Sequence, residues 1–149
     1  MGLLGFAYNR AQMKTLLLVT AIVAGCAGAA GAQTLKYEPA VVRLTGTFVT
    51  GEGLGLNDER TDVDKKVSFP AIRLKTPVRV EADPKDDLNV ESEDNVSMVQ
   101  LIIGNAAQMK QYASLKGKAV VVTGTLSHQI TAQHYTKVLL DVQTIEPLH

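Results

Sequence analysis

The sequence predicts a mainly β domain that carries one helix and follows an N-terminal signal peptide. Three observations support this fold class. Short segments rich in β-branched residues alternate between apolar and polar positions, polar glycine-containing segments separate them, and only residues 105–115 show convincing helical periodicity. The chain of 149 residues leaves room for a single domain with one core after the signal peptide.

The first 32 residues have the pattern of a secretory signal. Lys14 supplies a positive charge and Leu16–Ala24 forms a short apolar run. Ala30–Ala32 then provides the small residues that a signal peptidase requires. The apolar run is too short for a membrane-spanning helix, which needs roughly 20 residues. Met13, directly before the lysine, is a better initiator than the first residue.

Cys26 leaves a second form of export open. Residues 23–26, Val-Ala-Gly-Cys, resemble a bacterial lipobox, in which the peptidase cuts before the cysteine and the thiol then carries a lipid anchor. Cleavage after Ala32 fits the spacing from Met13 better, and it leaves no cysteine for a disulfide. We therefore expect residues 33–149 to form one periplasmic or secreted domain, with a membrane-tethered lipoprotein as the alternative.

The balance of charges argues against a nucleic-acid partner. The chain holds 15 Lys and Arg against 15 Asp and Glu, and loss of Arg10 and Lys14 with the signal would leave a net charge of −2. Nonspecific nucleic-acid binding depends on phosphate neutralisation and counterion release. The few aromatic residues also offer no evident platform for base stacking.

The first two strands are predicted at Val41–Thr50 and Phe69–Glu81, joined by a long polar loop at Gly51–Lys66. β-Branched residues dominate the first strand, and Gly46 in its middle indicates a bulge or a tight bend. In the second strand apolar residues alternate with basic ones. Pro77 cannot donate to a sheet ladder, so it indicates an edge or a bulge at that point.

An acidic loop at Glu81–Asn95 and a third strand at Val96–Ile103 come next. The helix follows at Asn105–Leu115. Its first residue is a good N-cap, and Gln108 three positions later completes a capping-box pattern. Gly117 stands where a left-handed residue typically ends a helix.

Two more strands complete the chain: Lys118–His128, with Gly124 in its middle, and Tyr135–Ile145. Three strands, one helix and two strands is the element order of the OB-fold, a five-stranded Greek-key barrel. We therefore predict a five-stranded OB-like barrel with the helix between strands 3 and 4. A β-sandwich with a decorating helix and an SH3-like barrel stay open as alternatives.

Three segments resemble a known family. They are Tyr37–Thr47, Leu115–His128 and Thr136–Leu140, and the first two share a Thr-Gly-Thr run. They are similar to an uncharacterised family of exported bacterial domains of unknown function, and the similarity spans nearly all of the mature chain. More distantly, the layout resembles small periplasmic OB-fold proteins linked to envelope stress. The resemblance implies an OB-like barrel and an exported location, and it implies no activity.

Arg73, Lys75 and Arg79 form the first candidate binding site. They alternate along the second predicted strand and would therefore share one face of it. Such a basic row can hold a phosphate, an anionic glycan or an acidic protein patch. It is also common as an ordinary solvated strand face that discourages edge-to-edge pairing, so both interpretations stay open.

His128 and His134 flank the predicted turn between the last two strands, next to Tyr135. A hairpin would bring the two imidazoles together, and this loop is a second candidate binding element. A metal site needs more ligands, and no Cys, Asp or Glu lies between the two histidines. We therefore expect surface histidines here, with no metal and no other cofactor.

The acidic loop is the third candidate site. Its carboxylates are Glu81, Asp83, Asp86, Asp87, Glu91, Glu93 and Asp94. Their spacing does not match an EF-hand, which requires ligands at alternate positions and a central glycine. We expect a mobile, solubilising loop.

The sequence contains no nucleophile elbow, P-loop or zinc-protease motif, so we do not expect an enzyme. The prediction is a noncatalytic binding or interaction domain of the bacterial cell envelope, whose partner is an unidentified envelope protein or an anionic ligand. The alternative is a structural or envelope-stress accessory protein that docks to a protein partner without a small ligand. An enzyme is the remote alternative.

Overall fold

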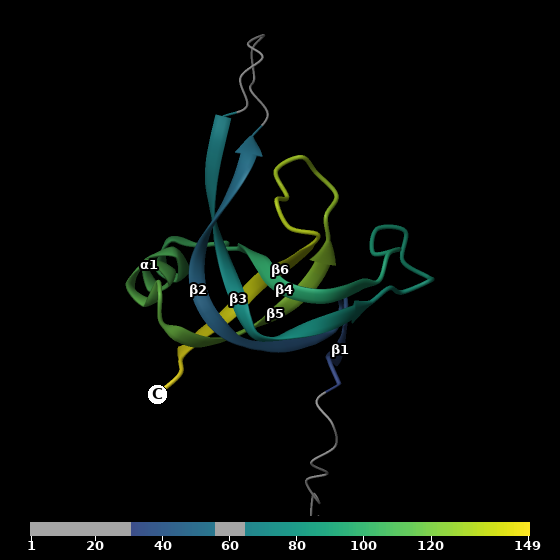
Figure 1. The fold of residues 1–149 in the computed structure, drawn as a ribbon, viewed down its shortest axis with the longest axis horizontal. Coiled ribbons are helices and arrows are strands. Elements are labelled where there is room, and N and C mark those ends of the chain that lie inside the picture. Colours follow the sequence, from purple (N-terminus) through teal and green to yellow (C-terminus); the bar gives the residue numbers. More distant parts are fainter. Residues whose placement is uncertain (1–30, 56–64) are drawn as a thin grey trace, which may run out of the picture.

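The computed structural model describes residues 31–55 and 65–149. In these residues six strands and one helix follow one another (Figure 1). They are β1 (Gln33–Lys36), β2 (Val41–Gly55), β3 (Lys65–Glu81), β4 (Glu93–Ile102), α1 (Ala106–Leu115), β5 (Ala119–His128) and β6 (Val138–Pro147). The prediction of a mainly β fold with one helix is confirmed. Cys26 and most of the predicted signal peptide lie outside the described residues.

Across 31–55 and 65–149, no helix combines the length and the apolar character that crossing a bilayer requires.

Five of the strands pair in a closed ring. β2 pairs antiparallel with β3 and β5, while β3 pairs antiparallel with β4 and β5 with β6. Parallel pairing of β4 with β6 joins the two ends. Figure 1 shows the strands curving around one another. The apolar side chains that alternate along the strands fill a single core, which includes Phe48, Ile72, Val80, Val99, Leu101, Val120, Val122, Leu126 and Leu140.

The sequence pattern does not predict β1, because four residues are too few to show a strand period. β1 pairs in parallel with the end of β3, from Gln33 beside Val78 to Lys36 beside Glu81, and only Leu35 of this strand is buried. Once β1 is counted, the helix follows the fourth strand rather than the third. It lies between β4 and β5.

Both boundaries of the loop predicted at Gly51–Lys66 are wrong. β2 runs on to Gly55 and β3 begins at Lys65, so the two strands continue beyond the ring as a paired extension. We call this extension, residues 51–55 with 65–69, the arm. It projects from the rest of the fold in Figure 1.

The glycines of the arm serve close packing rather than a turn. A Cβ atom on Gly51 would lie 2.3 Å from the Phe69 ring, and one on Gly53 would lie 2.4 Å from the Tyr135 ring. Two aromatic rings therefore rest directly on the backbone of β2. Glycine in a strand can mark such an approach, which is why its use as a loop signal fails here.

The irregularity predicted at Pro77 is confirmed. The register between β3 and β4 shifts between Arg73 and Val78, the stretch that contains Pro77. The register between β5 and β6 shifts between Thr123 and Gly124. At Gly46 the pairing of β2 with β3 and with β5 has no register shift, so the structure shows no bulge there.

α1 begins one residue after its predicted start. The Asn105 side chain caps it by accepting a hydrogen bond from the Gln108 backbone N–H at 2.9 Å. The reciprocal half of the predicted capping box is absent, because the Gln108 side chain donates to the carbonyls of Val142 and Gln143 on β6. Gly117 has φ +79°, the left-handed conformation expected after the helix.

The helix is fixed to β2 by an aromatic pair. Tyr112, its buried residue, packs against Phe48 with ring centroids 5.1 Å apart. Its hydroxyl donates to the Val49 carbonyl at 2.7 Å. The Gly117 N–H donates to the Phe48 carbonyl at 2.8 Å, so the residues that follow the helix are also hydrogen-bonded to β2.

Two further boundaries differ from the prediction. β4 begins at Glu93 rather than Val96, because the Glu93 carboxylate has partners that allow it to be buried. β6 begins at Val138 rather than Tyr135. Residues 129–137, between β5 and β6, form a loop that we call the β5–β6 loop.

Candidate functional site

The structure divides the predicted basic row. Arg79 forms a hydrogen-bonded ion pair with Asp94, and this bond raises the pKa of the Arg79 guanidinium. Arg73 and Lys75 are exposed on β3. The three cations therefore do not act as one uniform site, because Arg79 is already paired with the Asp94 carboxylate.

Arg73 and Lys75 have a basic neighbour that the sequence pattern did not single out. Lys75 and Arg43 of β2 line the same open pocket of about 320 Å³, together with the hydroxyl-bearing Thr45 and Thr76. Arg73 lies opposite Thr47 in the β2–β3 register. We call Arg43, Arg73 and Lys75 the basic face. Arg43 lies near Lys75 only because β2 pairs with β3. The alternation of residues within one segment carries no information about that pairing.

One acidic residue contacts the basic face. Glu146 of β6 forms an ion pair with Arg43 at 3.2 Å, and both side chains are more than half exposed. Exposed pairs of this kind contribute about 0–1 kcal/mol, so an anionic ligand can displace the glutamate at little cost.

The β5–β6 loop is held in place by a buried glutamine of β4. Gln100 Oε1 accepts a hydrogen bond from the Tyr135 N–H at 2.7 Å, and Nε2 donates to the Gln133 carbonyl at 3.3 Å. The Gln100 backbone N–H donates to Thr136 Oγ1 at 2.9 Å. Three hydrogen bonds from one strand position thus fix the end of the loop.

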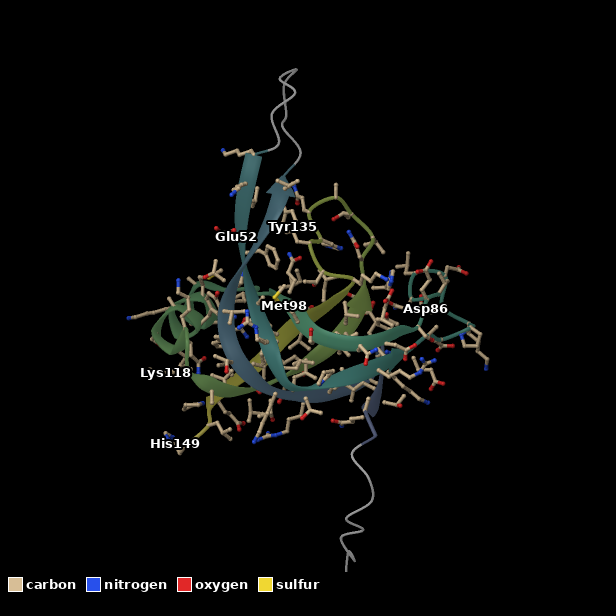
Figure 2. All side chains as sticks on the ribbon, in the orientation of Figure 1. Glu52, Asp86, Met98, Lys118, Tyr135 and His149 are labelled. Carbon is tan, nitrogen blue, oxygen red and sulfur yellow. The ribbon has the colours of Figure 1, made fainter. Side chains whose placement is uncertain are left out.

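Tyr135 joins this loop to the arm. Its ring stacks on Phe69 with centroids 5.0 Å apart and an interplanar angle of 16°. Figure 2 shows Tyr135 lying against the arm near Glu52. An open groove of about 640 Å³ lies beside this stack, lined by Lys65, Lys66, Ser68, Ala132, Gln133 and Tyr135. Because one face of the ring lies on Phe69, Tyr135 positions the loop rather than offering a free stacking surface.

His128 and His134 bind different partners, so the hairpin does not pair the two imidazoles. His134 Nδ1 accepts a hydrogen bond from the Ile130 N–H at 3.1 Å, within the β5–β6 loop. His128 Nε2 lies 3.1 Å from Glu93 Oε1 and 4.0 Å from Glu91 Oε2. The sequence pattern missed this cluster because the glutamates precede the histidine by more than 30 residues.

Buried and hydrogen-bonded groups surround His128. Asn89, which is 1% exposed, accepts a hydrogen bond from the His128 N–H at 2.8 Å through Oδ1. Glu93 Oε2 lies 3.0 Å from Lys137 Nζ. Burial favours the neutral form of Glu93, but hydrogen bonds from His128 and Lys137 outweigh it and lower the pKa of the carboxyl.

Tyr37 packs beside the same cluster. Its ring meets the His128 ring edge-on at 6.1 Å, and its hydroxyl donates to the Glu91 carbonyl at 3.1 Å. Burial, followed by the nearby charges of Glu93 and Glu91, raises the pKa of Tyr37 to about 12. The tyrosine is therefore neutral at physiological pH and acts as a hydrogen-bond donor.

The acidic loop is more structured than a solubilising segment needs to be. Asp86, on the right-hand side of Figure 2, accepts hydrogen bonds from the backbone N–H of Leu88 and from the Asn89 side chain. These bonds lower the pKa of Asp86. Asp94 pairs with Arg79, and Glu93 is buried. Asp86, Glu93 and Asp94 thus have specific protein partners rather than solvent alone.

Residues 98–146 match the family model of a domain of unknown function, DUF4431. This match confirms the predicted similarity to an uncharacterised domain family. It runs from β4 through α1 and β5 into β6, which is a shorter span than the resemblance suggested. It includes His128, His134 and Tyr135, whereas Arg73, Lys75 and Arg79 lie before it. No curated protein matches the chain.

Proposed function

We propose that this chain is a noncatalytic binding domain of the bacterial cell envelope that holds an anionic ligand on the basic face. The observation that carries the proposal is the convergence of Arg43 and Lys75 from neighbouring strands on one open pocket, with Thr45 and Thr76 beside them. Guanidinium and ammonium groups with adjacent hydroxyls suit phosphate, sulfate or carboxylate groups. Arg73 adds a third cation on the same face of β3.

We further propose that the closed ring is an OB-like barrel. Its pairings support this, because five strands close through one parallel contact between β4 and β6, and the helix lies between β4 and β5. Gly46 and Gly124 also support it, since each lies where a strand passes very close to its neighbour's backbone. The added strand β1 pairs in parallel with the last residues of β3.

Ligand binding is tested by thermal unfolding with tripolyphosphate and with a sulfated glycan at low ionic strength. A ligand that binds only the folded state raises Tm, by roughly 5 °C when it is well above its Kd. We expect Arg73→Glu combined with Lys75→Glu to abolish the shift, and added salt to weaken it.

The matched control reverses the same number of charges elsewhere. Lys110→Glu combined with Lys116→Glu changes two exposed lysines at the helix and should leave the Tm shift intact. If both double variants lost the Tm shift equally, the shift would depend on net charge rather than on the basic face. If neither anion shifted Tm, the proposal of an anionic ligand would be overturned. A protein partner captured by crosslinking would then favour the alternative, docking to a protein.

The envelope location rests on the proposed signal peptide. β1 begins at Gln33, directly after the proposed cleavage site, so removal of residues 1–32 would leave every described element intact. Mass measurement of the mature N-terminus tests this step. We expect a chain that starts at Gln33; a lipidated Cys26 would show the tethered form instead, and an unprocessed chain inside the cell would contradict export.

A further inference from the structure

We propose that Glu91, Glu93 and His128 form a binding site for a divalent transition-metal ion, with Zn²⁺ as the best match. The three side chains each offer one ligand atom, and these atoms lie within 4.8 Å of one another. They come from the end of the acidic loop, the start of β4 and the end of β5. This inference does not depend on the anionic ligand proposed for the basic face.

The separations suit tetrahedral coordination. With bonds of about 2.0–2.1 Å to nitrogen and oxygen, neighbouring ligand atoms around Zn²⁺ stand roughly 3.3 Å apart. His128 Nε2 lies 3.1 Å from Glu93 Oε1 and 4.0 Å from Glu91 Oε2, so the observed distances bracket that value. The Glu91 side chain is 70% exposed, which leaves its carboxylate room to turn toward an ion.

The histidine ring is oriented as a metal ligand requires. His128 Nδ1 lies 3.2 Å from the Gln129 carbonyl, which accepts a hydrogen bond from it. Without an ion, Nε2–H donates to Glu93; this proton would leave on metal binding, and the contact from Nδ1 to the Gln129 carbonyl would keep Nε2 directed toward the two carboxylates. Histidine ligands are commonly fixed by such a contact from the other ring nitrogen to a carbonyl.

The carboxylates are supported in the same way. Glu93 Oε2 is held by Lys137 Nζ at 3.0 Å, so Oε1, which accepts from His128 without an ion, is the oxygen that would bind the metal. The Tyr37 hydroxyl holds the Glu91 backbone at 3.1 Å, and Asn89 holds the His128 backbone at 2.8 Å. Each proposed ligand therefore has a neighbour that restricts its position before an ion arrives.

Charge and ligand type favour a transition metal over calcium or magnesium. Two carboxylates and one lysine leave a net charge of −1 around a neutral imidazole, which a divalent cation offsets. Calcium and magnesium prefer shells made of oxygen, whereas a mixed nitrogen and oxygen set suits Zn²⁺ and its neighbours. Three protein ligands leave a fourth position for water or for a donor group from a partner.

The site is tested by calorimetric titration of Zn²⁺ into the full chain at pH 7, with Cys26→Ser in every sample to remove a competing thiol. We expect one tight site per chain. His128→Gln and Glu91→Gln should each weaken binding at least 10-fold. Because Glu91 is largely exposed, its variant is expected to fold, and it keeps the test valid if His128→Gln does not.

Matched controls replace a histidine and a carboxylate outside the cluster. His134→Gln and Asp94→Asn should leave the Zn²⁺ affinity within about twofold of the parent, since neither side chain belongs to the trio. Co²⁺ should give the intense visible absorption of a four-coordinate ion, and Glu91→Gln should remove it. Absence of stoichiometric Zn²⁺ binding, or affinity unchanged in both Glu91→Gln and His128→Gln, would overturn the proposal.

Discussion

Gly124→Ala is expected to lower the free energy of unfolding by about 3 kcal/mol. A Cβ atom at this position would lie 2.0 Å from the Asp141 carbonyl oxygen of β6 and 3.2 Å from a methyl carbon of Leu140. The nearer atom belongs to the backbone of a paired strand, so it cannot move aside as the end of a flexible side chain would. The β5–β6 pairing must shift or part at its bulge.

Urea unfolding of the variant and of Gly104→Ala measures this effect. Gly104 precedes the helix, and an added Cβ there meets no atom within 4 Å, so the same chemical change should alter stability by no more than about 0.5 kcal/mol. Equal stability of the two variants would show that β5 and β6 do not approach each other as closely as described.

Much of the fold is predictable because strand signals here are local. Apolar residues alternate with polar ones along most of β3, and β5 and β6 each begin with an apolar run followed by mixed apolar and polar residues, in segments long enough for the pattern to show. The helix carries its own start and stop signals in Asn105 and Gly117. These features need no knowledge of the rest of the chain.

The parts that the sequence does not predict depend on neighbours distant in the chain. The arm is the clearest example, since Gly51 and Gly53 indicate a loop until the rings of Phe69 and Tyr135 are placed on them. β1 is similar, because its four residues are ordered by pairing with β3 rather than by their own pattern.

The candidate sites show the same limit. Arg73 and Lys75 are readable as a row within one strand, but Arg43 joins them only through the pairing of β2 with β3. His128 lacks acidic neighbours within its own segment, and its partners come from the end of the acidic loop and the start of β4. A signal for Gln100 does exist, since a polar residue between Val99 and Leu101 in an apolar strand indicates a specific hydrogen-bonding role.

Gln100→Met is expected to lower the free energy of unfolding by about 2 kcal/mol and to loosen the β5–β6 loop. Methionine keeps the approximate volume of the buried side chain but removes the acceptor for the Tyr135 N–H and the donor to the Gln133 carbonyl. Those two backbone groups then lose their partner, and both lost hydrogen bonds are partly buried. A buried polar group without a partner costs about 1–3 kcal/mol, more than the average hydrogen bond contributes.

Hydrogen exchange at the Tyr135 amide separates this local effect from a general loss of stability. Protection of that amide should fall further than protection of the β2 and β5 amides, because the hydrogen bond to Gln100 Oε1 is lost while the core remains packed. Gln143→Met, an exposed glutamine on β6, provides the control and should change neither quantity by a measurable amount. If Tyr135 remained fully protected in Gln100→Met, the stacking of its ring on Phe69 would by itself be sufficient to hold the loop against the arm.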